Sequence, residues 1–323
     1  MSPVVGVDIA KHSFDVATLL PNGKYRTRAK LANKAEGFQT LKAWLTLHAE
    51  PAAWVLMEAT GVYHEALAEY LHAQGYRVCV INPARIASYA KSQLQRVKTD
   101  KTDAKLIALY GHRHVDQLRD WTPEPPSLRR LRALVRRLAD LKEIAQMERN
   151  RLDVAESSVQ ASIRTVIELV EQQIAETLKA LKDHIDDDPD LRKKRDLLVS
   201  INGISDKTAA LLLAELGDPL RFTDANAVVA FAGLNPRLQD SGTYKGHVRI
   251  SRMGSAWLRA GLYMPALAAM IHNPAVSALK KRLQEKGKAG KQIVCAAMRK
   301  LLVIAYGVLK SGKPFEAKLA LAH

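Results

Sequence analysis

The sequence predicts a mixed α/β domain at the N-terminus, then a long helical segment, then a mostly α-helical C-terminal domain. Three observations lead to this prediction. Short apolar runs alternate with segments of helical spacing over residues 4–114. Residues 127–188 contain neither proline nor glycine, which is typical of long helices. The remainder consists of apolar helical segments around a loop rich in glycine and serine. We therefore expect the 323 residues to divide into parts 1–122, 123–189 and 190–323.

The N-terminal part begins with two apolar runs joined by a short polar turn. The PNGK sequence at 21–24 is typical of a hairpin turn into a third strand. Later continuous apolar runs indicate buried parallel strands. In order, the expected elements are strands 4–10, 13–20 and 24–32, helix 35–49, strand 52–61, helix 63–75, strand 76–83 and helices 84–97 and 98–114. This is the order of an RNase H-like fold. No Gly-rich turn follows the first strand, which argues against a dinucleotide-binding fold.

The middle part, residues 123–189, has apolar residues at a spacing of three and four. A single helix over this segment would be roughly 90 Å long. Two antiparallel helices that reverse near 150–160 fit the pattern equally well. Because the apolar stripe is narrow and long, we expect a coiled-coil dimerisation arm rather than a spacer.

The C-terminal part contains a possible helix-hairpin-helix at 197–216. That motif presents backbone N–H groups to a phosphate, and Gly203 stands at its first glycine position. Ser205 takes the second glycine position, so a plain helical hairpin is an equal alternative. Between Arg237 and Lys300 there are thirteen lysines and arginines but only two acids. This imbalance predicts a nucleic-acid-binding surface.

The overall charge points to the same class of partner. The formal net charge is +16 and the isoelectric point is near 9.8, which favours a polyanion such as nucleic acid. A ribosome-associated or merely soluble basic protein is the alternative. The cysteine and histidine positions lack zinc-site spacing. We recognise no signal peptide and no apolar stretch long enough to cross a bilayer, so we expect a cytoplasmic protein.

Four acidic residues stand at informative positions. Asp8 lies within an apolar strand, Glu58 near the end of a later strand, and Asp100 and Asp103 on one face at a helix start. In an RNase H-like sheet these side chains would meet at one edge, and carboxylates that repel one another are tolerated when they share divalent cations. We therefore expect a Mg²⁺ site with two ions. Taken singly, Glu58 could form a strand-end salt bridge, and the pair at 100 and 103 could cap a helix. Other acids, such as Asp15, are expected at ordinary exposed positions.

Several motifs together resemble one known family. GVDIAK, MEATG, KTDKTDA and the later AGLNPR, SG and LYMPA segments resemble the DEDD transposases of bacterial insertion sequences. These are serine recombinases guided by a bridge RNA, with a RuvC-like catalytic domain and a C-terminal domain of the Transposase-20 type. The resemblance covers nearly the whole chain, and its metal-binding tetrad matches Asp8, Glu58, Asp100 and Asp103.

The resemblance also implies a mechanism and partners. The nucleophile of the family matches Ser241 in QDSGTYKG, which would form a covalent phosphoserine with DNA. The implied partners are donor DNA, target DNA, a guide RNA and further copies of the chain as dimers that pair into a tetramer, in a bacterial, nucleoid-associated setting. From the residues alone a Ser-Gly pair is usually a turn. Lys245, Arg249, Arg252 and Arg259 are the expected nucleic-acid contacts. The alternative is a metal-dependent junction nuclease that uses water as nucleophile.

Overall fold

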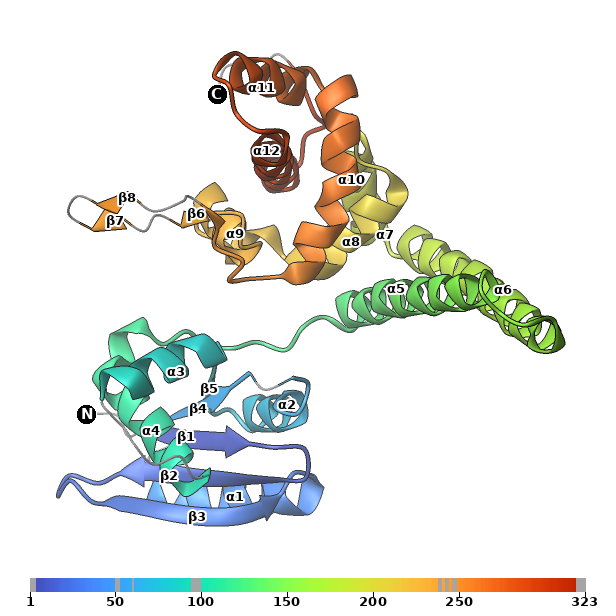
Figure 1. The fold of residues 1–323 in the computed structure, drawn as a ribbon. Helices are drawn as coiled ribbons and strands as arrows, with labels where there is room; N and C mark the ends of the chain where they lie inside the picture. The colour runs from blue at the N-terminus through green and yellow to red at the C-terminus, as the bar shows by residue number, and fades with distance from the viewer. Residues whose placement is uncertain are drawn as a thin grey trace. The chain divides into compact units, whose positions relative to one another are not determined.

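The computed structural model describes residues 4–49, 53–59, 61–93, 100–237, 240–241, 244–245 and 249–317. The side chains of residues 100–102, 237, 240–241, 244–245 and 249 lie outside this description. The chain forms two compact units, Met1–Glu124 and Pro125–His323, and each is treated by itself (Figure 1). The boundary between the units lies close to the expected end of the N-terminal part. The division into three parts stays a prediction.

A five-stranded mixed sheet forms the centre of the first unit (Figure 1). Its strands are β1 (Val4–Ile9), β2 (Ser13–Leu19), β3 (Tyr25–Ala32), β4 (Trp54–Glu58) and β5 (Arg77–Ile81), in the order β3-β2-β1-β4-β5. The first three strands are antiparallel neighbours, and β4 and β5 run parallel to β1. The predicted mixed α/β domain is confirmed. The narrower RNase H-like assignment stays a prediction.

Side chains of a strand alternate between the two faces of the sheet, and here both faces are apolar. Two helices cover each face. Helices α1 (Ala35–His48) and α2 (Glu65–Ala73) pack on the face that carries Val5 and Val7. The opposite face carries Val4 and Leu56 and packs against α3 (Pro83–Ser92) and α4 (Asp100–Arg113). A short 3₁₀ turn, Val115–Gln117, follows α4.

The second unit begins with a helical hairpin formed by α5 (Pro126–Leu152) and α6 (Ser157–Asp187). Its helices are antiparallel, because the start of α5 at Leu131 shares a core with the end of α6 at Ile185, whereas Ala145 packs with Val170. The chain therefore reverses at 153–156, and the segment is two helices rather than one. The coiled-coil and dimerisation roles of this hairpin stay predictions.

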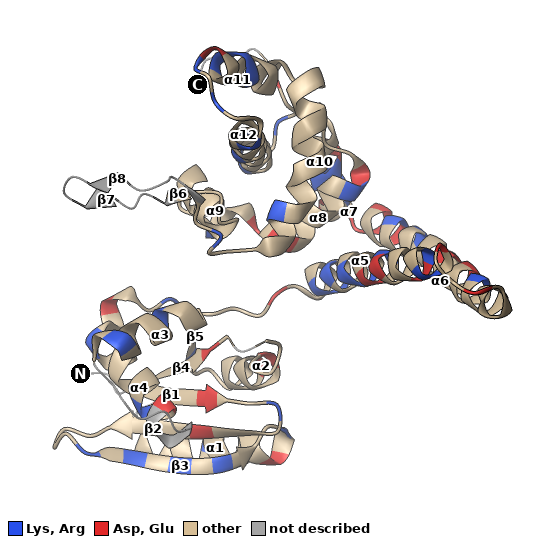
Figure 2. Cartoon of the chain, viewed as in Figure 1, with Lys and Arg blue, Asp and Glu red and all other residues tan. Residues whose placement is uncertain are grey.

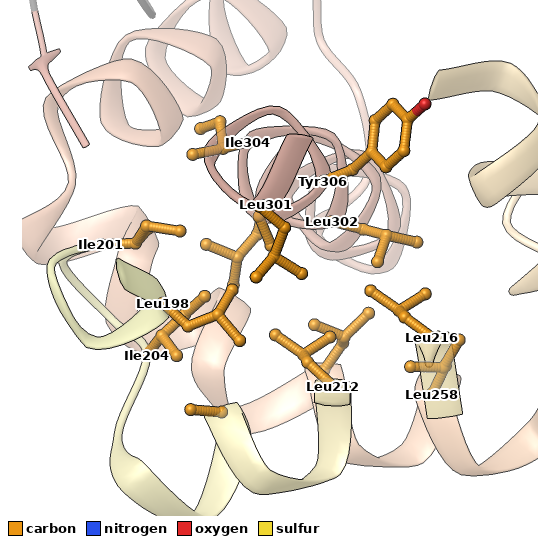
Figure 3. Close-up of a cluster of buried hydrophobic side chains, with 14 of the residues drawn as sticks. Leu198, Ile201, Ile204, Leu212, Leu216, Leu258, Leu301, Leu302, Ile304 and Tyr306 are labelled. Carbon is orange, nitrogen blue, oxygen red and sulfur yellow. The ribbon is translucent and has the colours of Figure 1, made fainter. Parts of the chain in front are cut away.

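The rest of the second unit is mostly helical and packs around α12 (Figures 1 and 3). Its elements are α7 (Pro189–Val199), α8 (Asp206–Leu216), the 3₁₀ turn Pro219–Arg221, α9 (Ala225–Phe231), β6 (Pro236–Arg237), β7 (Asp240–Ser241), β8 (Tyr244–Lys245), β9 (Arg249–Ile250), α10 (Ala256–His272), α11 (Pro274–Glu285) and α12 (Gly290–Ser311). Figure 3 shows side chains of α7, α8, α10 and α12 meeting in one apolar core, with Leu301 and Leu302 fully buried. The predicted mostly α-helical remainder is confirmed.

One sequence expectation about α12 needs correction. Among the described helices, α12 is long and apolar enough to cross a membrane by length and composition, although no such stretch was expected. Half of its apolar window is buried within the protein. Core helices of soluble proteins pass the same test, and α12 occupies that position in the core shown in Figure 3.

The hairpin between α7 and α8 has a packing reason for its glycine. Gly203 has φ +101°, and a Cβ placed there would lie 2.8 Å from the Cβ of Ala269 in α10. Close approach between this turn and α10 therefore accounts for Gly203. The phosphate-binding role of a helix-hairpin-helix stays a prediction.

Candidate active site

The strand register brings Asp8 and Glu58 to the same end of the sheet. Val7 of β1 pairs with Met57 of β4, and each acid is the next residue on its strand. Because side chains alternate, Asp8 lies on the face of Gly6, and Glu58 lies on the face of Leu56. Both acids therefore belong to the face that α3 and α4 cover. The acidic segments of β1, β2 and β4 are red in Figure 2.

Helix α4 crosses this face in close contact with β1. A Cβ at Gly6 would lie 2.3 Å from the backbone nitrogen of Ala108 and 2.4 Å from the carbonyl oxygen of Ala104. Further along α4, a Cβ at Gly111 would lie 2.6 Å from Cγ1 of Val4. The helix therefore runs antiparallel to β1, with its first residues toward Asp8. A glycine at position 6 is what lets the two backbones come this close.

The rise per residue of β1 and of α4 shows which part of α4 lies beside Asp8. A helix rises about 1.5 Å per residue and a strand about 3.3 Å per residue. Stepping from Gly6 to Asp8 along β1 therefore corresponds to roughly four residues of α4. Gly6 lies against residues 104–108 of α4, so Asp8 lies beside the first turn of α4, which includes Asp103. Asp100 begins α4, and its side chain lies outside the described residues.

The structure brings Asp8, Glu58 and the start of α4 to one face of the sheet, and the described residues show no formed metal cluster there. Asp8, Glu58 and Asp103 are half-buried, and each has at least one interaction partner. Among the described side chains, no three acidic, histidine or cysteine groups are close enough together to hold a metal ion. The donors are carboxylate oxygens on one face, which are the ligands that a hard cation such as Mg²⁺ prefers. In donor chemistry, Asp8, Glu58 and Asp103 fit such an ion.

A fifth acid, Asp15, is buried beside Asp8, contrary to the expectation of an exposed position. It lies directly opposite Asp8 across the β1–β2 pair and retains only 8% of its accessible surface. Its Oδ1 accepts a hydrogen bond of 2.7 Å from the backbone nitrogen of Lys30. Sequence reasoning missed this burial. A signal existed, because a tight turn between β1 and β2 pairs position 8 with position 15.

Asn33 connects the two loops that leave the acid-bearing strands. Its Nδ2 donates to the carbonyl oxygen of Ala10, just after β1, at 3.1 Å. It also donates to the carbonyl oxygen of Tyr63, in the segment after β4, at 3.0 Å. These bonds hold the exits of β1 and β4 together. His64, the residue after Tyr63, is buried, and burial lowers its pKa. The charge of Glu65 and a hydrogen bond from the imidazole to the Gly61 backbone act in the opposite direction.

In the second unit, Ser241 lies in β7 and pairs with Tyr244 of β8. The neighbouring strands β6 and β9 pair Arg237 with Arg249. Short antiparallel ladders therefore replace part of the loop that the sequence predicted. The side chains of Ser241, Lys245 and Arg249 lie outside the described residues. Their roles as nucleophile and nucleic-acid contacts stay predictions.

Two other predicted contact residues lie after β9. Arg252 is exposed and has φ +56°, a conformation that few residues other than glycine adopt. Arg259 of α10 uses one nitrogen, Nη1, to donate to the carbonyl oxygens of Ala232 at 2.9 Å, Gly254 at 3.1 Å and Ser255 at 3.2 Å. Arg259 therefore stabilises the segment between β9 and α10 and links it to the end of α9. Its contact with nucleic acid stays a prediction.

A buried carboxylate fixes the start of α10 near these ladders. Glu215 of α8 is 7% exposed, and its Oε2 accepts from Oγ of Ser255 at 2.8 Å. Its Oε1 lies 3.5 Å from Nη2 of Arg136 in α5. Ser255 also accepts from the backbone nitrogen of Leu258 and so caps α10. Glu215 thus joins α5, α8 and α10, and sequence reasoning did not identify it.

Comparison with known proteins matches parts of both units to transposase families. Residues 5–155 match a DEDD transposase family of IS110 type, described as "Transposase", and residues 195–281 match the "Transposase IS116/IS110/IS902 family". The pilin gene-inverting protein of Moraxella bovis is 33% identical over 319 residues, or 98% of each chain. The transposase for insertion sequence element IS1328 of Yersinia enterocolitica is 26% identical over 348 residues, covering 97% of this chain and 98% of its own. The first match contains the four predicted acids, and the second contains Ser241.

Proposed function

Because the chain belongs to the IS110 family of transposases, and so to a family of DNA-transfer enzymes, we propose that it is an RNA-guided DNA recombinase with a serine nucleophile. The observation that carries the proposal is the placement of acids on the sheet. Asp8 and Glu58 share the face that α4 crosses with its first turn toward Asp8. The basic composition supports a nucleic-acid substrate.

The four acids would hold the divalent cations of the reaction. Asp8 and Glu58 would bind from the sheet, and Asp100 and Asp103 from the start of α4. Bound ions would stabilise negative charge on a phosphate oxygen and favour ionisation of a nearby hydroxyl. Every predicted ligand is a carboxylate, so the site would favour hard cations such as Mg²⁺ over softer metals.

In the proposed reaction, Ser241 forms an ester with a DNA phosphate. Its hydroxyl loses a proton to water, its Oγ bonds to phosphorus, and the bond from phosphorus to the adjacent nucleoside oxygen breaks. The leaving oxygen takes up a proton, so the step exchanges one phosphodiester for another. A hydroxyl of a new strand then displaces Ser241 in the reverse sense, which transfers the strand. Arg252 and the lysine and arginine at 245 and 249 would bind phosphate oxygens.

A covalent adduct between protein and DNA tests the nucleophile. Wild-type protein incubated with its RNA, DNA and Mg²⁺ should give a protein–DNA band on a denaturing gel. The S241A variant should give no adduct, and the S251A variant, which removes the nearest serine in the same segment, should keep it. Adduct formation by S241A would show that the assigned nucleophile is wrong. Full strand cleavage by S241A without any adduct would favour the alternative, a junction nuclease that uses water.

The RNA and the assembly need separate measurements. Removal of co-purifying RNA should abolish site-specific strand transfer and its return should restore it, because base pairing by the guide would supply the sequence reading. Mass measurement should give a dimer alone and a tetramer with both DNA molecules, with the α5–α6 hairpin as the expected dimerisation arm. Strand transfer at the same DNA sites without RNA would contradict the proposal that RNA selects the site.

A further inference from the structure

The buried carboxylate of Asp15 carries an inference that rests on the proposed metal site and extends it. Asp15 and Asp8 face each other across β1 and β2, and residues opposite each other in a sheet have Cβ atoms about 5 Å apart. Like charges at such positions repel and destabilise a sheet. Burial of Asp15, which is 8% exposed, makes its charge more costly still. The pair therefore needs a reason beyond strand formation.

The bond to Lys30 explains part of the arrangement. The β2–β3 register shifts between Phe14 and Val16, so that Asp15 faces an irregular part of β3. Lys30 lies there with φ +57°, a left-handed conformation that is rare for lysine. Its backbone nitrogen donates to Oδ1 of Asp15. Irregularities of this kind are frequent beside active sites, where they redirect a side chain.

A hydrogen bond from an amide does not account for the charge, because the neutral amide of asparagine would accept the same bond. Among the described residues Asp15 forms no ion pair. Lys105 of α4 has its Nζ 5.7 Å from the centre of the Tyr25 ring. The carboxyl group of Asp15 thus lies opposite Asp8 on the sheet face where the divalent cations are proposed to bind.

We infer that Asp15 is a positioning residue whose charge strengthens divalent-cation binding at Asp8 and Glu58. In this role Asp15 adds negative potential behind the cation ligands and keeps β2 in register with Asp8. Residues that support metal ligands from behind typically contribute about tenfold or more to metal affinity. The competing explanation is that Asp15 only satisfies the Lys30 amide and has no effect on the ions.

The D15N variant separates the two explanations because it keeps an acceptor for Lys30 and removes only the charge. Mn²⁺ binding to the full-length protein, measured by electron paramagnetic resonance without DNA, should weaken about tenfold or more in D15N. The melting temperature in chelator should be unchanged or raised, since a buried repulsion is relieved. The D120N variant, which removes an exposed carboxylate paired with Arg77 in the same unit, should bind Mn²⁺ like the wild type.

The outcomes distinguish this inference from the proposed function. Mn²⁺ binding that is lost in D8N but unchanged in D15N would overturn the role of Asp15 and leave the metal site intact. Absence of Mn²⁺ binding by the wild type would overturn the metal site, and the inference with it. Where D15N alone is too unstable, the D15N/K30G variant relieves the left-handed conformation at position 30 and allows the same comparison.

Discussion

The close passage of α4 over β1 gives the sharpest prediction, through the G6A variant. A methyl group at position 6 would lie 2.3 Å from the nitrogen of Ala108 and 2.4 Å from the oxygen of Ala104, whereas ordinary contacts begin near 3.4 Å. Both atoms are backbone and cannot rotate away. Helix α4 would therefore have to withdraw from β1 by about 1 Å. Overpacking of this kind costs about 1–3 kcal/mol of unfolding free energy.

If the proposed function holds, the same displacement should impair strand cleavage, because the first turn of α4, which carries the proposed ligands Asp100 and Asp103, lies toward Asp8. A shift of about 1 Å in catalytic groups can lower a rate by roughly 100-fold. We therefore expect G6A to lose both stability and strand cleavage. Urea denaturation followed by tryptophan fluorescence measures the first loss. Three of the four tryptophans, at 44, 54 and 121, belong to the first unit and report on it.

The G307A variant is the matched control for exchanging glycine for alanine. Gly307 lies within α12, where a Cβ would have open space, so alanine should be neutral or stabilising by up to about 1 kcal/mol. Its strand cleavage should equal that of the wild type. A G6A protein that unfolds within about 0.5 kcal/mol of the wild type, with normal cleavage, would refute the inferred contact between α4 and β1.

Two further predictions concern buried polar groups. The E215A variant removes the acceptor of Ser255 and the partner of Arg136, so its unfolding free energy in urea denaturation should fall by about 1–3 kcal/mol. The E215Q variant should lose less, because its amide oxygen still accepts from Ser255. Equal stability of E215A and the wild type would contradict the role of Glu215 in joining these helices. Burial lowers the pKa of His64 below its usual 6.5, so the unfolded chain binds more protons than the folded one as pH falls through that value, and the unfolding free energy should drop toward acid. The H64Q variant should lack this drop when its unfolding free energy is measured against pH. The same dependence of unfolding free energy on pH in both proteins would contradict the prediction.

Local periodicity and turn residues were sufficient to predict the main elements. The apolar runs in the first 83 residues and the PNGK turn predicted the five strands, because alternation and turn chemistry are set by neighbouring residues. The absence of proline and glycine from residues 127–188 predicted the helical segment in the same way. Motifs that resemble a family selected Asp8, Glu58 and Ser241 as candidate site residues from the sequence. The roles of those residues remain proposals.

Features that depend on contacts between distant segments were decided only by the tertiary structure. Sequence alternation places Asp15 on one side of β2, but its burial requires the irregular β3 and the Lys30 amide, fifteen positions away. The long helical segment reverses at 153–156 because packing between α5 and α6 decides between one helix and two. Gly6 likewise looks like an ordinary strand residue until α4 is seen to cross it. The sequence alone determined the main strands of the first unit and the helical character of the rest, because hydrogen bonding within helices and turns is local. Burial and close approach depend on what the rest of the chain places above each face, so only the tertiary structure decided them.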